Sequence, residues 1–299
     1  MGGRKVLIIV FGVTAVLISG CRQDDELSHL IAESPFKNPS LENPGDILIV
    51  TCQYYPLEIP GHVDMTRWPF WEKYNAVAFA DGSSPDSTGG FHVQQLRLWQ
   101  ENGFQVAIAP MVSWSDFRQT VLRAGGQALS QSTALIRRPV DVARFTAYWL
   151  YQDRSIFISE GFGSGRALTL PAGDCVFAVN CIPGLGGRQA KEFYIKIVPE
   201  VHSALEEEKF GEDEFGVLRR IQERPKISFD PLSLSGTIPR GYYLVIAGRP
   251  GPAAAGKLGP LFLSNQIGGQ NRQLAVVIAP DMQTGVRKNP ELSNQILPK

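Results

Sequence analysis

Short apolar runs rich in β-branched and aromatic residues recur along the chain, and glycine- or proline-rich turns separate them. Runs of this kind, bounded by turn residues, predict strands. From residue 143 onward their close spacing indicates an antiparallel sheet or sandwich. The expected strands are 47–55, 104–110, 143–151, 155–160, 167–170, 174–182, 192–198, 227–229, 232–238, 242–247, 259–263 and 274–279.

Two segments place their apolar residues at helical spacing instead. Residues 92–102 form one expected helix, which stops at Gly103. Residues 114–124 form the other, with a glycine pair after it and Ser113 or Ser115 as its N-cap. A helix, strand and helix therefore follow one another in this part of the chain.

The fold class that follows is α+β, with a small mixed α/β part over 46–130 and a larger antiparallel β-rich part over 131–280. The two parts form either separate cores or one shared core. The glycine-rich segment 161–166 predicts a hairpin turn, because a strand and not a helix follows it. The segment 205–216 carries six acidic residues and predicts a solvated loop or an exposed helix end. Residues 281–299 are expected to be a frayed, disordered tail.

The first 21 residues, MGGRKVLIIVFGVTAVLISGC, combine a short positive start, an apolar run and an exit of small residues. This layout is that of a secretory signal peptide. Because Ile18, Ser19 and Gly20 precede Cys21, the segment resembles the signal of a bacterial lipoprotein. The alternatives are an ordinary signal peptide and an uncleaved membrane-spanning helix, although a span needs roughly 20 apolar residues and this run is shorter.

The lipoprotein resemblance implies that residues 1–20 are a signal peptide, removed by cleavage between Gly20 and Cys21. Cys21 then carries lipid, with palmitate among its acyl chains, and anchors the chain to a membrane. Arg22 stands where an Asp favours inner-membrane retention in enteric bacteria, so the resemblance implies the periplasmic face of the outer membrane. Residues 21–45 are expected to form a lipidated tether, since they are polar and contain three prolines.

The formal net charge is zero, and it becomes −2 once Arg4 and Lys5 leave with the signal. Such a balance predicts no nucleic-acid partner. Apart from the cysteine of the signal, the chain contains Cys52, Cys175 and Cys181. We expect these to be small buried apolar residues, or else partners in a disulfide, which an exported protein can form.

The sequence contains none of three motifs that are typical of enzyme active sites: G-x-S-x-G, H-E-x-x-H and C-x-x-C. We therefore expect no catalytic residues, no metal and no cofactor. The one alternative is His62 with Asp64, which share a face if they lie in a strand, together with Asp81 in a later loop. Trp68 and Trp71 belong to an aromatic cluster nearby, which is either core or a ligand-binding surface.

Four segments carry a resemblance: FYIKIVPEV at 193–201, GYYLVIAG at 241–248, LGPLF at 258–262 and LAVVIAP at 274–280. In this order they resemble the C-terminal β-module of bacterial secretins, the outer-membrane rings of secretion systems and of type IV pilus machinery. The resemblance covers 193–280 and implies an oligomer or secretion-machinery partners. Carboxylates lie where secretins place a membrane-inserted hairpin, so a degenerate relative without a pore is expected.

Two functions follow from these observations. The first is a lipid-anchored cell-envelope protein of non-catalytic, structural or assembly type, with a degenerate secretin-like module. The second is an anchored envelope hydrolase or ligand-binding protein that uses the region of His62, Asp64 and Asp81. The first requires a surface that suits a partner protein. The second requires His62 and Asp64 to face one cleft beside Trp68 or Trp71.

Overall fold

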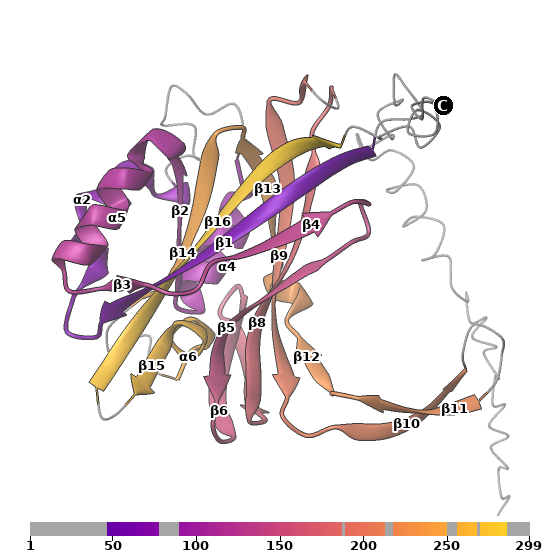
Figure 1. Ribbon diagram of the computed structural model, residues 1–299. Helices are drawn as coiled ribbons and strands as arrows, with labels where there is room; N and C mark the ends of the chain where they lie inside the picture. Colours follow the sequence, from indigo (N-terminus) through magenta and orange to yellow (C-terminus); the bar gives the residue numbers. More distant parts are fainter. Residues whose placement is uncertain are drawn as a thin grey trace, which may run out of the picture. The chain divides into compact units, whose positions relative to one another are not determined.

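The computed structural model describes residues 47–77, 90–186, 189–212, 218–249, 256–267 and 270–285, which all belong to one compact unit, Ser40–Lys299. Most of these residues lie in antiparallel strands, so the fold is α+β with a β-rich character (Figure 1). The strands are β1 Ile47–Pro60, β2 Phe104–Pro110, β3 Gln127–Ala128, β4 Ser132–Ile136, β5 Ala143–Leu150, β6 Arg154–Gly161, β7 Ser164–Leu170, β8 Gly173–Pro183, β9 Glu192–Ser203, β10 Glu207–Glu212, β11 Leu218–Glu223, β12 Lys226–Ser228, β13 Leu234–Pro239, β14 Tyr242–Gly248, β15 Ser264–Ile267 and β16 Gln270–Gly285. The helices are η1 Met65–Arg67, α2 Pro69–Tyr74, α4 Val93–Glu101, η2 Met111–Ser113, α5 Trp114–Arg123, η4 Asp230–Leu232 and α6 Leu258–Leu263.

Two sheets of unequal size carry the fold. Sheet A has seven strands, with β2, β14, β16, β1 and β3 as successive neighbours, while β4 also pairs with β1 and β15 with β16. Its longest pairing joins β1 to β16, from Ile47 opposite Gly285 to Pro60 opposite Arg272. Sheet B has five strands, in the order β12, β9, β8 and β5, with β13 also paired to β9. The pairs β6–β7 and β10–β11 are separate two-stranded ribbons.

Strand β1 continues through Pro56, where the sequence predicted its end. Residues 50–54 pair with β4, residues 57 and 58 pair with β3, and Pro56 lies in the gap between the two. Its carbonyl accepts a hydrogen bond from the Leu129 N–H at 2.9 Å, so its nitrogen also faces that gap. Proline has no N–H to donate, and at this position no ladder hydrogen bond is lost.

Side chains of sheet A alternate between two cores, one on each face. On β16, Val276 and Ile278 belong to one core, whereas Val277 and Ala279 belong to the other. Both faces of the central strands are therefore buried. This explains why these strands are continuous apolar runs in the sequence and not alternating ones.

The larger core lies between sheet A and sheet B and includes α4 and α6. Phe104 of β2, Phe177 of β8 and Phe262 of α6 meet there, with ring centroids 5.6 to 6.1 Å apart. Trp99 of α4 packs on Phe104 at 4.7 Å, and its indole N–H donates to the Leu232 carbonyl at 2.5 Å. Residues before and after position 130 contribute to this cluster, so the two expected parts share one core.

The smaller core lies between the other face of sheet A and the helices α2 and α5, which appear beside β2 in Figure 1. Small side chains cover this face of the sheet and let aromatic residues of the helices approach closely. Phe70 and Phe117 meet there with ring centroids 4.3 Å apart. The alanines of this face are Ala107, Ala109, Ala247, Ala275 and Ala279.

The structure confirms the two helices as α4 and α5 and the hairpin turn at 161–166 between β6 and β7. Gly161 and Gly163 have φ angles of 89° and 76°, which glycine adopts readily. Ser113 is the N-cap of α5, but its hydroxyl donates to the Pro110 carbonyl and contacts the Tyr243 hydroxyl instead of capping the helix.

Three expectations are wrong in the structure. The segment 259–263 lies in helix α6, because Leu258 and Phe262 share its buried face at a spacing of four residues. The acidic segment 205–216 contains strand β10. Strand β16 continues to Gly285, so the expected tail begins in a sheet, and residues 286–299 lie outside the described residues. In the part of the chain that the structure describes, no helix is both long and apolar enough to cross a membrane.

Helix α6 depends on a close backbone approach at Gly259. A Cβ atom there would lie 2.2 Å from the carbonyl carbon and oxygen of Gly103, and the Gly259 N–H donates to the Asn102 carbonyl at 2.8 Å.

We predict that Gly259→Ala lowers the free energy of unfolding by about 1–3 kcal/mol, because the two backbone segments have to move apart. Urea denaturation would measure this loss. Ser264→Ala, at an exposed position just after α6, is the control and should change stability little. Equal stability of wild type and Gly259→Ala would contradict the packing described.

Candidate functional site

The structure places His62 and Asp64 in a turn and not in a strand. Asp64 is the N-cap of η1, where its Oδ1 accepts hydrogen bonds from the Thr66 N–H at 3.1 Å and from the Thr66 hydroxyl at 2.5 Å. Its Oδ2 lies 3.0 Å from Nε of Arg67. The hydrogen bond from the Thr66 hydroxyl is the main reason why the pKa of Asp64 is lowered. This carboxylate is thus engaged in shaping the turn.

His62 is exposed and lines a cavity of about 600 Å³ together with Gly61, Asn271 and Arg272. Asp64 is not among the described residues that line this cavity. His62 and Asp64, on which an acid–base site would depend, therefore do not face the same cavity.

The tryptophans of the aromatic cluster contribute to the smaller core. Trp71 is buried, with 2% of its surface exposed. Trp68 is half-buried and packs edge-on against Phe117, with ring centroids 6.3 Å apart. These contacts match the core interpretation of the cluster and leave little of Trp71 for a ligand.

The other three predicted site residues, Asp81, Gly20 and Cys21, lie outside the described residues. Within the described ranges, no group of three or more His, Cys, Asp or Glu side chains is arranged to hold a metal ion.

The three described cysteines, Cys52, Cys175 and Cys181, are free thiols and fully buried. Burial raises the pKa of the Cys52 thiol to about 12, and it also raises the pKa of the other two. At neutral pH these side chains are uncharged and unreactive, as expected for small apolar residues.

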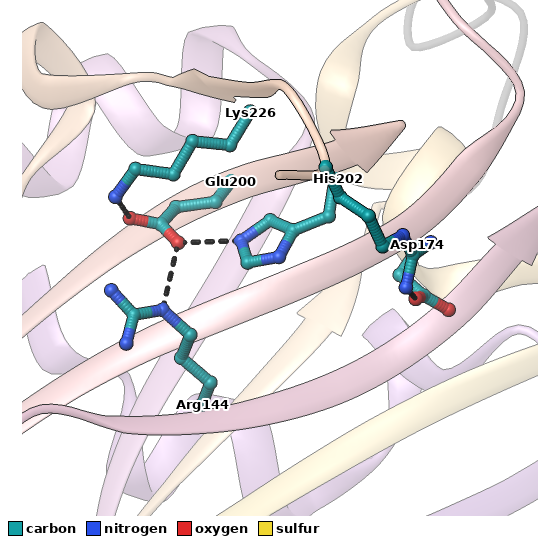
Figure 2. A network of polar contacts seen from close by, with 6 residues as sticks. Arg144, Asp174, Glu200, His202 and Lys226 are labelled. Atoms are coloured by element: carbon teal, nitrogen blue, oxygen red, sulfur yellow. Dashed lines mark hydrogen bonds and ion pairs between the residues drawn. The ribbon is translucent and has the colours of Figure 1, made fainter. Parts of the chain in front are cut away.

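A network of charged side chains lies on the outer face of sheet B. Inward side chains of β9 such as Ile197 and Val201 enter the larger core, and Glu200 between them faces outward. Figure 2 shows Glu200 with three partners that come from different positions along the sheet. The partners are Arg144 of β5, His202 of β9 and Lys226 of β12.

Both oxygens of the Glu200 carboxylate contact donor groups of the network. His202 Nε2 lies 2.8 Å and Arg144 Nε 3.3 Å from Oε2, and Lys226 Nζ lies 3.3 Å from Oε1. Only 6% of the Glu200 side chain is exposed, whereas the Arg144 and Lys226 side chains are each 46% exposed. Burial by itself raises the pKa of Glu200, but the hydrogen bonds from His202 and Lys226 and the positive charges outweigh burial and lower it.

This arrangement can hold strands together but offers little for catalysis. A carboxylate that accepts from three donors has a lowered proton affinity, so it is a poor general base. The network instead connects β5, β9 and β12 across the sheet, with β8 between β5 and β9.

Arg224 extends the polar face to the base of the β10–β11 ribbon. Its Nε donates to the Ser203 carbonyl at 2.7 Å, and its guanidinium lies 3.0 Å from the Asp174 carboxylate. The same guanidinium lies 5.9 Å from the centre of the Trp149 ring. The end of β11 is therefore fixed to sheet B by one side chain with three contacts.

Sequence reasoning did not find this network. Arg144, Glu200 and Lys226 are far apart in the chain, and only the register of β5, β8, β9 and β12 brings them together. The available signal was Glu200 itself, an acidic residue inside the apolar run FYIKIVPEV. Such a residue in a strand needs a charged or hydrogen-bonding partner.

No protein-family model matches this chain, and no curated protein matches it. Solved structures that align with it include the secretin InvG of the Salmonella SPI-1 type III secretion injectisome, at 12% identity and a TM-score of 0.17, over 83% of this chain and 67% of that one. InvG in the basal body with PrgH and PrgK aligns at 12% identity and a TM-score of 0.17, over 83% of this chain and 47% of that one. The secretin GspD of the E. coli K12 type II secretion system aligns at 10% identity and a TM-score of 0.19, over 91% of this chain and 56% of that one.

These alignments are a weak structural resemblance to secretin chains. In two of the three, this chain spans about half of the other protein. TM-scores below 0.2 do not establish a shared fold, so the site has to be interpreted from its own geometry.

The charge network makes a prediction about stability and pH. Glu200→Gln keeps the shape of the side chain but leaves Arg144 and Lys226 without their anion, and we expect it to lower the free energy of unfolding by about 2 kcal/mol at neutral pH. The pKa of Glu200 is lower in the folded chain than its ordinary value of 4.5, so its contribution is complete above that value. The contribution of the Glu200 charge to the free energy of unfolding is lost as the pH falls through the lowered pKa, because the wild-type carboxylate then becomes protonated and neutral, like the Gln side chain.

Urea denaturation of both proteins at neutral pH and at about pH 3 would test this. The difference between them should shrink at the lower pH. Glu160→Gln is the matched control, because Glu160 forms an exposed pair with Arg166 at 3.0 Å and should contribute at most about 1 kcal/mol. A difference that stays constant over this pH range would show that the network does not act through the charge of Glu200.

Proposed function

We propose that this protein is a lipid-anchored component of the bacterial cell envelope with a structural or assembly role and no catalytic activity. The observation that supports this best is the β10–β11 ribbon. In this proposal the lipid on Cys21 holds the chain at the membrane, and the ribbon binds a partner protein of the envelope.

The ribbon has the structure of a docking element. Among the described strands, β10 and β11 pair with each other and with no other strand, from Glu207 opposite Glu223 to Glu212 opposite Leu218. It extends away from β9 and β12 in Figure 1. The side chains of the ribbon whose burial the structure describes are exposed: Glu207, Glu208, Arg220, Gln222 and Glu223.

An isolated two-stranded ribbon is only marginally stable in water. Its outer edges carry N–H and C=O groups that can pair with a strand of another chain. The base is well held, because Arg224 contacts Ser203, Asp174 and Trp149, and the Ser203 N–H donates to the Pro225 carbonyl at 2.8 Å. A fixed base with uncovered strands is what binding by strand addition requires.

The anchor is tested by fractionation. We predict that a chain with an ordinary cleavable signal in place of residues 1–20, combined with Cys21→Ser, appears in the soluble periplasmic fraction and takes up no labelled palmitate. The chain with its own signal should be labelled and should sediment with membranes, and Ser28→Ala in the tether is the control that should behave like it. Membrane sedimentation of the unlabelled Cys21→Ser chain would refute lipid anchoring through this residue.

The assembly role is tested by removing the ribbon. We predict that replacement of Glu207–Glu223 by two glycines leaves the chain in the membrane but reduces its size in detergent extracts from an assembly to a single chain. Size-exclusion chromatography with light scattering measures this. Phe162→Ser, at the exposed tip of the β6–β7 hairpin, is a control that should leave the assembly intact. A wild-type chain that already elutes as a single chain would rule the assembly role out.

A further inference from the structure

A second cavity, of about 560 Å³, lies between the turn that joins β5 to β6, helix α6 and the start of β16. It shares Gly61, Asn271 and Arg272 with the cavity beside His62. Its size falls within the range of small-molecule sites in proteins, roughly 300–1,000 Å³. No described residue of the β10–β11 ribbon lines it.

The lining of this cavity is strongly positive. Arg154, Arg249, Lys257 and Arg272 line it, and no Asp or Glu is among the described residues that do. The whole chain has 29 basic and 29 acidic residues, so a described lining with four basic side chains and no acidic one is a marked local departure from the average. A concave positive surface concentrates anions.

Two of the four cations, Lys257 and Arg272, are held in place by contacts with other residues of the protein. The Lys257 ammonium donates to the Glu101 carbonyl at 2.5 Å, which leaves further N–H groups of Lys257 without a described partner. Arg272 Nε lies 3.4 Å from the Glu58 carboxylate, which also accepts from the Gln127 side chain at 2.6 Å. These contacts fix the position of positive charge on the wall of the cavity before any ligand arrives.

The other two cations, Arg154 and Arg249, have no carboxylate within ion-pair distance among the described residues. Both side chains are exposed at the cavity. Guanidinium groups bind phosphate and carboxylate through two parallel hydrogen bonds. Two guanidinium groups that have no ion-pair partner among the described residues, beside the fixed Lys257 ammonium, suit a ligand with more than one negative charge. Phosphate monoesters fulfil this condition.

The remaining lining suits the organic part of such a ligand. Tyr148 and Tyr151 are neighbours, with ring centroids 6.4 Å apart, and both line the cavity together with Leu261. Ser155 and Ser264 add neutral hydrogen-bonding groups. Apolar and aromatic walls with a few polar groups are typical of sites that bind small organic molecules.

We propose that this cavity binds an organic phosphate, with the phosphate group on Arg154 and Arg249 and the organic part against Tyr148 and Leu261. The same chemistry is present in a soluble sugar phosphate and in the headgroup of a phosphatidic acid. Binding here is independent of the assembly role of the ribbon, because no described residue of β10 or β11 lines the cavity.

Isothermal titration calorimetry of the full chain in neutral detergent tests this proposal. The probes are glucose 1-phosphate and dihexanoyl phosphatidic acid, and their phosphate-free counterparts, glucose and dihexanoylglycerol, are the ligand controls. We expect one-to-one binding of at least one phosphate compound and none of its counterpart. Binding of glucose 1-phosphate identifies a soluble ligand, and binding of phosphatidic acid alone identifies a lipid headgroup. Binding of neither overturns the proposal.

Variants connect the binding to the cavity. Arg154→Gln and Arg249→Gln should each weaken binding about 10- to 100-fold, because each removes a charge-assisted hydrogen-bonding group. Arg154→Lys keeps the charge without the planar fork and should have a smaller effect. Arg118→Gln, at an exposed position on α5, should have none. Unchanged affinity in the Arg154→Gln/Arg249→Gln double variant, or an equal loss in Arg118→Gln, would show that the cavity is not the binding site. The unfolding midpoint of each variant verifies that the fold is retained.

Discussion

The antiparallel pairing of β1 with β16 is the interaction on which the rest of the structure depends. It brings the first described strand of the chain against the last, and Thr51 donates its hydroxyl hydrogen to the carbonyl of Asp281, 230 residues away. β14 and β2 join the sheet through β16, whereas β3 and β4 join it through β1. Both cores use side chains of these two central strands, one core on each face. Without this pairing neither the sandwich nor the helical layer has a surface to pack against.

Sheet B differs from sheet A because only one of its faces enters a described core. Its other face carries charge, and the charges are organised around a carboxylate that is almost fully buried. Such a group is costly to leave without partners, and three donors from three strands satisfy it. Asp174 and Arg224 continue this polar surface to the foot of the β10–β11 ribbon. The stiffness of the ribbon's base is therefore a property of sheet B, not of the ribbon itself.

The sequence predicted most of the strands, both α4 and α5, and the hairpin at 161–166, because periodicity and turn residues report local structure. It underestimated the lengths of β1, β9 and β16, since Pro56, Pro199 and Pro280 lie inside strands whose partners tolerate them. Helix α6 was missed because a short apolar run fits either period. The burial of Leu258 and Phe262 on one helix face depends on tertiary packing, which the sequence does not display.

The candidate sites were harder to predict than the fold. Residues 62 and 64 are close in sequence, which suggested a pair, yet a tight turn directs one toward a cavity and the other toward its own backbone. Conversely, positions 144, 200 and 226 have no visible relation in the sequence and meet through strand register alone. Anchoring through Cys21 remains a prediction of the sequence, because that residue lies outside the described part of the chain.

The same β1–β16 pairing has a consequence for how the chain reaches its native state. Contacts between residues this far apart make the contact order high, and such topologies fold slowly because a long loop must close before any of its contacts form. The central sheet cannot be completed until the last strand has been synthesised. Strand β1 therefore lacks its partner along most of its length until β16, the last described strand, has emerged.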